Sequence, residues 1–300
     1  MSSETKEKLL TSMANASYYN ASPRDLESLH AESRQYLSKA QHLIPEEQLL
    51  GLLEQHFYLA LLTCKDSEAK LVLQRLTDRI TEDPSRVAIL KAQYIEATDG
   101  PEAAQKFLSA RPTGDLRAFK RKTVILKQKG DIKTYIKELL RYVEEVAPND
   151  SEAWAELAEA YVSIGQYPQA IHALEEVLIS APQASNIFAR LGEVFLIEAT
   201  TSSPNKVTSD QLTLLIHSAQ HFLRSVELSP DYIRGWCGAL IASSKILAWP
   251  KLAAEESTKY TKISKIAKKQ TQRLIKTAKE AAISDEDIAA AKIIIAQYEN

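Results

Sequence analysis

A repeat of 34 residues restricts the fold of this 300-residue chain more than any other feature of its sequence. An aromatic residue, a leucine and a second aromatic residue recur together at this step, first as Trp154, Leu157 and Tyr161 and then as Phe188, Leu191 and Phe195. Pro148 recurs as Pro182 at the same step. A self-similar period of this length is typical of proteins built from stacked helical hairpins.

A third copy of the repeat is displaced by an insertion. Pro230 follows Pro182, and Trp236 follows Phe188, each after 48 residues. Both steps equal 34 plus 14, so one insertion of 14 residues explains them. The segment EATTSSPNKVTSDQ, residues 198–211, is rich in Ser, Thr and Pro. It is predicted to be this insertion, lying between two helices.

Within one period the apolar residues follow two helical stripes. The first stripe has the spacing i, i+3, i+4, i+7 and comprises Trp154, Leu157, Ala158 and Tyr161. The second comprises Ala170, Leu174 and Val177. Gly165 is predicted to form the turn between the helices, and Pro182 ends the second one. This arrangement is the tetratricopeptide pattern. Because one hairpin cannot bury its own apolar face, we predict an all-α solenoid of stacked tetratricopeptide hairpins with flanking N- and C-terminal helices.

The same reasoning divides the chain into three parts. Residues 1–47 are predicted to be an N-terminal helical segment, 48–248 the repeat solenoid, and 249–300 a C-terminal helical extension. Helix pairs are expected at about 48–83, 85–111, 115–147, 151–181 and 185–229. Ser22, Pro23 and Asp25 have the pattern that begins a helix. Further helices are expected from about 231, through 251–282, and at 285–299 with Ser284 as its cap.

Composition excludes several classes of protein. The 8 glycines are few for an all-β fold with many tight turns, and the net charge of −2 gives no sign of nucleic-acid binding. The N-terminus lacks the apolar segment of a secretory signal, and Arg234 and Lys245 interrupt the most apolar window, so the protein is predicted to be cytosolic with no membrane span. The two cysteines, Cys64 and Cys237, are expected to be reduced and buried.

No pattern of catalytic, cofactor-binding or metal-binding residues stands out. Nothing resembles GxGxxG, a P-loop, HExxH or a nucleophile elbow. His217 and His221 share one helical face in HSAQH, but no carboxylate or thiol completes a metal site there. We therefore predict a solvated helix face for this pair, no metal or cofactor, and no enzymatic activity.

The face of the first helices that is not used for packing is predicted to line a partner-binding groove. In a tetratricopeptide stack, positions 2, 5, 6, 9, 12 and 13 of each first helix point into such a groove. The candidates are Arg121, Lys122, Glu152, Glu156, Glu159, Asn186, Arg190 and Glu193. They give a negative centre between positive neighbours, which suits a basic or amide-rich segment. The alternative is that these glutamates only solvate a helix. Their charge also argues against binding the C-terminal carboxylate of a chaperone.

The segment 251–279 carries nine Lys and Arg residues against two Glu. Its apolar stripe is predicted to include Tyr260, Ile263, Ile266, Ala267 and Leu274. Such a helix is suited to docking on partner helices or anionic lipid. Equally, it suits a solvated helix that caps the end of the solenoid.

Several stretches resemble one family of tetratricopeptide proteins. They are LRAFKRKTVILKQKGDIKTYIKELLRYVE, the repeats from NDSEAWAELAEAY to GEVFLIEA, and SVELSPDYIRGWCGAL after the widened repeat. Together they are similar to the soluble subunit 2 family of the endoplasmic-reticulum membrane protein complex, over roughly residues 45–250. The insertion is a departure from the family and leaves the partner contacts there open.

This resemblance implies a role rather than an activity. The complex inserts tail-anchored and multi-spanning proteins into the endoplasmic-reticulum membrane. The family implies a cytosolic scaffold, attached peripherally to that membrane, which holds a second soluble subunit and cytosolic segments of membrane subunits. The alternative from the residues alone is a soluble tetratricopeptide adaptor or co-chaperone that binds peptides.

Overall fold

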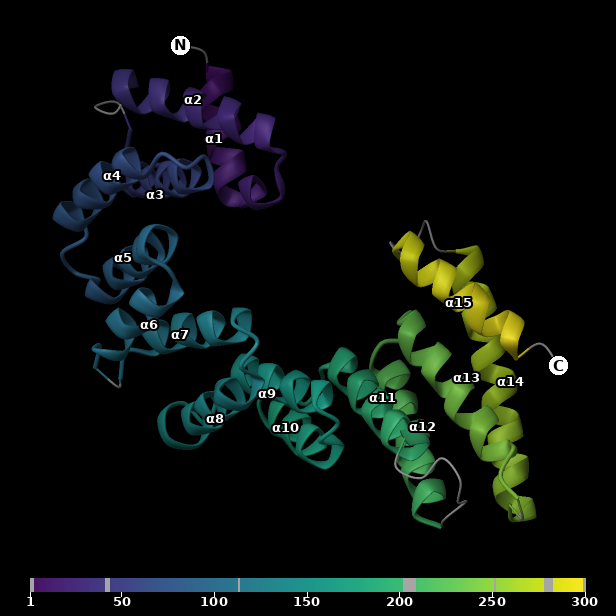
Figure 1. Cartoon of the computed structure of the whole chain (residues 1–300). Coiled ribbons are helices and arrows are strands. Elements are labelled where there is room, and N and C mark those ends of the chain that lie inside the picture. The colour runs from purple at the N-terminus through teal and green to yellow at the C-terminus, as the bar shows by residue number, and fades with distance from the viewer. Residues whose placement is uncertain are drawn as a thin grey trace. The chain divides into compact units, whose positions relative to one another are not determined.

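The computed structural model describes residues 3–40, 44–112, 114–201, 209–250, 252–277 and 283–298. Within these ranges the chain forms helices and turns and no strand, so the all-α prediction is confirmed (Figure 1). The chain divides into two compact units, residues 1–135 and 136–300. The boundary falls inside helix α8, and the division of the sequence into three parts stays a prediction.

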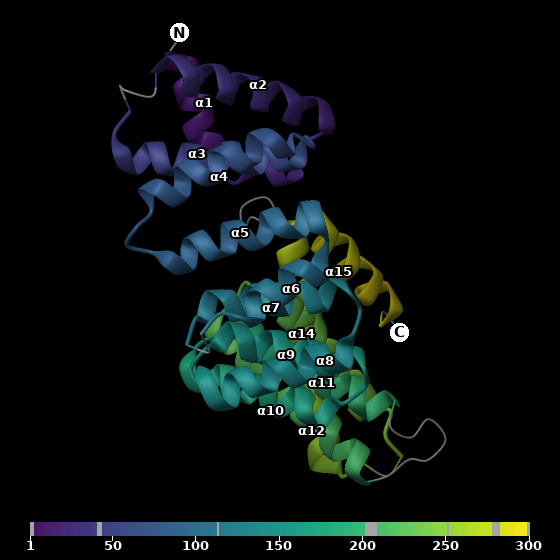
Figure 2. The same ribbon diagram turned by 60° about the vertical axis from the view of Figure 1, so that its left-hand side comes forward.

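Unit 1 contains four helical hairpins or parts of hairpins. Its helices are α1 (Ser3–Ala14), the 3₁₀ turn η1 (Ser17–Asn20), α2 (Pro23–Ala40), α3 (Glu46–Leu62), α4 (Asp66–Arg79), α5 (Pro84–Asp99), α6 (Pro101–Ser109), α7 (Leu116–Gln128) and the start of α8 (Ile132–Arg141). The pair α3 and α4 lies side by side in both ribbon views (Figures 1 and 2). Leu9, Leu53 and Phe57 are fully buried in its largest apolar cluster. Ser22 begins α2 as predicted, accepting a hydrogen bond from the Asp25 amide at 3.3 Å.

Unit 2 contains the clearest repeats. It begins at the end of α8 and continues through the π-helical turn η3 (Tyr142–Val146), α9 (Ser151–Ser163), α10 (Tyr167–Ser180), α11 (Ser185–Thr201), α12 (Ser209–Leu228), α13 (Ile233–Leu247), α14 (Ala254–Lys276) and α15 (Asp285–Gln297). Trp154 on α9 is buried, and its indole N–H donates to the Pro148 carbonyl at 2.7 Å. Trp236 on α13 makes the same bond to Pro230 at 2.7 Å, so the repeated Pro and Trp form one local motif.

A left-handed residue closes the turn inside several hairpins. Gly165 joins α9 to α10 with φ 73°, as its position in the repeat predicted, and Gly130 joins α7 to α8 with φ 75°. Only glycine adopts this conformation without a steric cost. At the corresponding turn between α3 and α4 the residue is Cys64, with φ 56°. Cys64 is exposed there, so the prediction of a buried thiol was wrong for this cysteine and right for Cys237.

Two other expectations need refinement. Helix α1 lies in the predicted helical segment 1–47, but the sequence analysis assigned no bounds to a helix there. The inserted segment 198–211 is not simply a loop, since α11 runs to Thr201 and α12 begins at Ser209. Much of the insertion therefore lengthens one hairpin. The rest, residues 202–208, lies outside the described residues.

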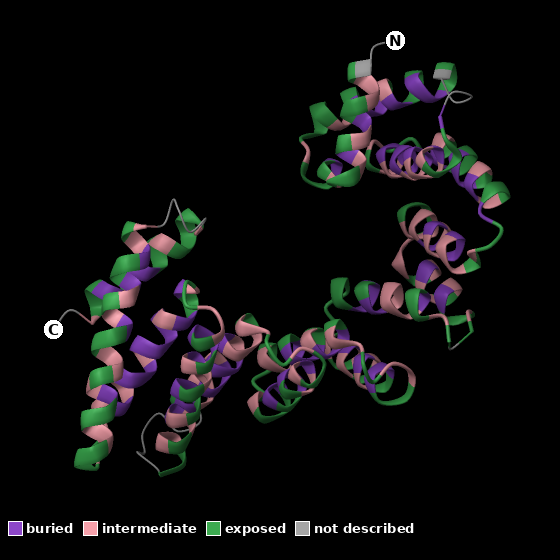
Figure 3. Ribbon diagram, turned by 180° about the vertical axis from the view of Figure 1, so that it is seen from behind, coloured by how far each residue is buried: buried purple, intermediate pink, exposed green. Residues whose placement is uncertain are grey.

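The buried residues run in stripes along the helices, with exposed residues on the opposite sides (Figure 3). On α14 the buried stripe is Tyr260, Ala267, Thr271 and Leu274, and the helix packs on α13. Ile266 was placed on this stripe by sequence, but it is 53% exposed. The contact with α13 favours the capping role for the basic helix.

Close helix approach in unit 2 depends on one aromatic ring between two glycines. Phe222 on α12 is fully buried and faces Gly192 on α11 and Gly238 on α13. A Cβ atom added at Gly238 would lie 2.1 Å from the Phe222 ring, and one at Gly192 would lie 2.9 Å from it. The ring occupies the space that a side chain at either glycine would need. The large aromatic residue of α12 therefore packs against small residues of α11 and α13.

The first prediction tests this contact. Gly238→Ala is expected to lower the free energy of unfolding by about 1–3 kcal/mol, because the new methyl overlaps the ring. Phe222→Leu removes the overlapping atoms. The double variant Gly238→Ala, Phe222→Leu should therefore lose less than the sum of the single losses, as measured by denaturant unfolding of the full chain. Additive losses would mean that the two residues do not compete for the same space.

Candidate functional site

The first helices of unit 2 are tied to one another by a chain of ion pairs. Arg190 on α11 donates to both carboxylate oxygens of Glu159 on α9, at 2.7 and 2.6 Å. It also donates to Glu193 on its own helix at 2.9 Å. Glu193 in turn accepts from Arg234 on α13 at 2.6 Å. We call Glu159, Arg190, Glu193 and Arg234 the unit 2 ladder, because they link α9, α11 and α13 in order.

The charges of the ladder are fixed by its own contacts. Hydrogen bonds from Arg190 to Glu159, and then to Glu193, raise the pKa of the Arg190 guanidinium despite its partial burial. The bond to Glu193 does the same for the pKa of Arg234. Two-oxygen contacts between arginine and a carboxylate also fix their relative orientation. The ladder therefore determines the relative orientation of the first helices more than it contributes to stability, since exposed ion pairs contribute about 1 kcal/mol or less.

The sequence-predicted groove residues separate into two groups. In unit 2, Glu159, Arg190 and Glu193 belong to the ladder, while Glu152 and Glu156 on α9 and Asn186 on α11 are exposed. Arg121 and Lys122 lie on α7 in unit 1. The prediction of a negative centre between positive neighbours stays a prediction, and the structure adds that Arg190 and Glu159 neutralise each other directly.

Unit 1 contains ion pairs of the same kind between successive first helices. Arg86 on α5 donates to Glu54 on α3 at 2.5 Å, and Arg121 on α7 donates to Glu96 on α5. In each pair the carboxylate lies on one first helix and the arginine on the next. Sequence reasoning found Arg121 but did not identify its carboxylate partner, Glu96.

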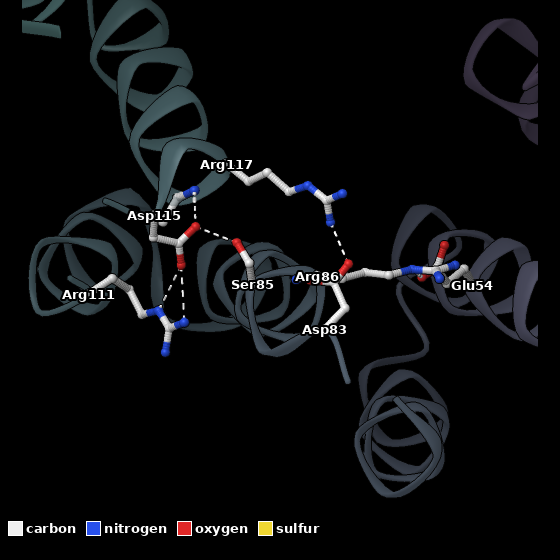
Figure 4. Close-up of polar contacts among 8 residues, drawn as sticks. Glu54, Asp83, Ser85, Arg86, Arg111, Asp115 and Arg117 are labelled. Atoms are coloured by element: carbon white, nitrogen blue, oxygen red, sulfur yellow. Dashed lines mark hydrogen bonds and ion pairs between the residues drawn. The ribbon is translucent and has the colours of Figure 1, made fainter. Parts of the chain in front are cut away.

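Aspartates at the starts of first helices connect these helices further (Figure 4). Asp83 accepts from the Arg86 amide at 3.0 Å, as the cap of α5, and from Arg117 of the next repeat at 2.6 Å. Asp115 caps α7 through the Ala118 amide at 3.1 Å. A cap satisfies one of the amides that a helix leaves without a partner.

The Asp115 carboxylate collects further donors. Ser85 donates to one oxygen, and Arg111 donates two bonds of 3.1 Å to the other (Figure 4). Burial opposes ionisation of Asp115, but the bonds from Ser85, Ala118 and Arg111 outweigh it and lower its pKa. The ionised form therefore stabilises the junction between α5 and α7.

A pH series tests this assignment. Because the folded pKa of Asp115 lies below the ordinary value, its contribution is complete above about pH 4 and is lost as the pH falls through the folded pKa. Asp115→Asn should lower the free energy of unfolding by about 1 kcal/mol at pH 7. The difference in free energy of unfolding between the variant and the parent protein should shrink below about pH 4. Asp99→Asn, at the exposed end of α5, is the control, and its free energy of unfolding should equal that of the parent protein. A difference for Asp115→Asn that is independent of pH would contradict the charged contact.

The histidine pair of α12 is solvated at one residue only, since His217 is exposed and His221 is half-buried. His221 stacks on Phe195 and Phe188 of α11, with ring centroids 5.2 and 6.1 Å apart, and His217 meets Phe195 edge-on at 5.4 Å. Burial lowers the pKa of His221. The His221 imidazole therefore packs against α11, while His217 stays on the solvated face as predicted. Sequence reasoning missed the packing of His221, because the pattern of α12 alone does not show what α11 brings against it.

A second histidine cluster was also missed. His30 on α2, His56 on α3 and Glu68 on α4 converge in unit 1, although no local spacing in the sequence joins them. Burial lowers the pKa of both imidazoles. Burial works against ionisation of Glu68, but the hydrogen bond from His56 and the nearby charges lower its pKa overall. Only the packing of three helices brings these residues together.

Among the described residues, none of the helices combines the length and the apolar character needed to cross a membrane.

Comparisons with known proteins point to one family. The model of a family described as "EMC2 TPR-like repeat domain" matches residues 68–206. The "ER membrane protein complex subunit 2" of Saccharomyces cerevisiae is 31% identical over 80% of this chain and 85% of its own length. The "TPR repeat protein oca3" of Schizosaccharomyces pombe is 31% identical over 72% of this chain and 73% of its own. The "ER membrane protein complex subunit 2-A" of Xenopus laevis is 27% identical, over 76% and 74%.

Proposed function

The chain belongs to the family of ER membrane protein complex subunit 2, and on this premise we propose that it is a scaffold subunit of a membrane-protein insertase. In this role it binds the cytosolic face of the endoplasmic-reticulum membrane peripherally and holds other subunits of the complex together. Those subunits include a second soluble subunit and the cytosolic segments of membrane subunits. The proposal assigns binding, not catalysis, to the first-helix surfaces.

The observation that carries the proposal is the exposed acidic face of α9. Glu152 and Glu156 are exposed, and Glu159, further along the same face, is held by Arg190 of the next first helix. Trp154 and Leu157 bury the opposite face. A helix with several carboxylates on one exposed face selects partners by charge, because complementary potentials favour one partner and like charges exclude others. A basic or amide-rich segment of another subunit fits this surface.

The third prediction reverses the charge of this face without touching the ladder. The full chain carrying Glu152→Lys and Glu156→Lys should fold as the parent does, because exposed substitutions usually change stability by no more than about 0.5 kcal/mol. It should nevertheless lose at least one membrane subunit when it is purified from cells in mild detergent. Subunit recovery is measured by mass spectrometry. The melting curve of the same variant shows whether it is folded.

The matched control carries Glu175→Lys and Glu176→Lys, the same change of charge on α10, the second helix of that repeat. It should retain every subunit. Equal recovery with both double variants would overturn the assignment of α9 as the binding face. Recovery of soluble chaperones and no membrane protein, even with the parent chain, would instead support a soluble adaptor or co-chaperone.

A further inference from the structure

Three potential metal ligands from three successive helices of unit 1 meet at one point. Nε2 of His56 lies 3.1 Å from Oε1 of Glu68, and Nε2 of His30 lies 3.3 Å from Oε2 of the same carboxylate. One ligand atom from each residue lies within 4.8 Å of the other two. The cluster is independent of the first-helix surfaces and has no part in the proposed scaffold function.

The cluster leaves polar atoms without partners in the interior. His30 is 1% exposed and His56 is 4% exposed. Nε2 of His30 and Nδ1 of His56 are buried; the first lies near Oε2 of Glu68 without forming a well-aligned hydrogen bond, and the second has no hydrogen-bond partner among the described residues. Buried polar atoms are nearly always paired, and an unpaired one requires an explanation such as an ion or a water molecule. Nε2 of His30, beside the Glu68 carboxylate, and the nearby Nε2 of His56 point to a ligand that binds imidazole nitrogen.

We propose that His30, His56 and Glu68 bind a divalent transition metal ion, with zinc as the best-matched member of that class. Imidazole nitrogen and carboxylate oxygen are zinc ligands, and two histidines with one glutamate form a known zinc-binding set. Ligands at about 2 Å from a tetrahedral metal ion lie about 3.3 Å from each other. The three ligand atoms, which lie within 4.8 Å of one another, therefore need to draw together by up to about 1.5 Å.

Binding also requires one ring to turn. The two imidazoles stack with an interplanar angle of 20° and centroids 4.9 Å apart, so their in-plane lone pairs run side by side. Rotation about the bond that joins the ring to Cβ is soft for histidine. A turn of either ring directs its nitrogen at the same point as the other.

The groups around the cluster determine how tightly a cation binds. Nζ of Lys65 lies 2.8 Å from Nδ1 of His30, and Nε of Arg34 lies 3.4 Å from Oε1 of Glu68. Arg75 on α4 adds a positive charge near His56, which lowers the pKa of that imidazole. While the Lys65 ammonium donates to Nδ1, the proton of neutral His30 is on Nε2. Metal binding therefore places that proton on Nδ1 and releases Lys65, whose exposed side chain swings into water.

The surroundings also supply an entry path. His56 and Glu68 line a hollow of about 460 Å³ together with Arg34, Ser67 and Arg75. Three protein ligands leave one position of a tetrahedral zinc ion open. Water in this hollow is able to reach that position.

The test measures zinc binding to the full, untagged chain by competition with a chromophoric chelator. The parent protein is expected to bind about one zinc ion. His56→Gln and Glu68→Gln should each weaken binding by roughly tenfold or more, the range seen when support for a bound metal is removed. The double variant His217→Gln, His221→Gln removes two imidazoles from α12 and should bind zinc as the parent does. Melting curves without zinc show whether each variant is folded.

Lys65→Met provides a test that does not disturb the ligands. It removes the cation that faces Nδ1 of His30 and should tighten zinc binding, while an ordinary buried histidine cluster would show no such gain. Bound cobalt should give the visible spectrum of a four-coordinate site in the parent and not in His56→Gln. Binding that is absent in the parent, or unchanged in His56→Gln and Glu68→Gln, would overturn the proposal.

Discussion

A hairpin of two helices in this chain cannot bury its own apolar stripe, and the rest of the structure depends on how the next hairpin covers it. The coverage is most specific in unit 2, where the Phe222 ring fills the space left by Gly192 and Gly238. Such contacts couple each repeat to its neighbours only. The polar side chains of α12 complete the contact, since Ser218 and Ser225 donate to backbone carbonyls of α11 at 2.7 Å each.

Charge then fixes how the first helices follow one another. The pairs from Glu54 to Arg86 and from Glu159 to Arg190 obey one rule, in which a carboxylate on one first helix meets an arginine on the next. Each pair contributes little to stability because it is partly solvated. The fixed geometry of the arginine–carboxylate pair still orients the first helices, and with them the surface that carries Glu152 and Glu156. The packing of the repeats is therefore linked to the binding of partners.

The sequence predicted the helices better than it predicted the contacts between polar side chains. Periodic apolar positions found Trp154 and the Gly165 turn, because both requirements lie within one repeat. Glu159 and Arg190 were identified as surface residues, but their mutual pairing depends on how two repeats stack. His30, His56 and Glu68 come from three helices without a common period, so no pattern along the chain connects them.

The central claim is that the acidic face of α9 contacts another subunit of a membrane complex. Photocrosslinking tests it most directly, with a photoreactive amino acid in place of Glu156 in the full chain on endoplasmic-reticulum membranes. The same amino acid in place of Glu175, on α10, is the comparison. The account predicts a crosslink from position 156 to another polypeptide of the complex and none from position 175. Crosslinks from position 175 alone, or from neither position in an intact complex, would contradict it.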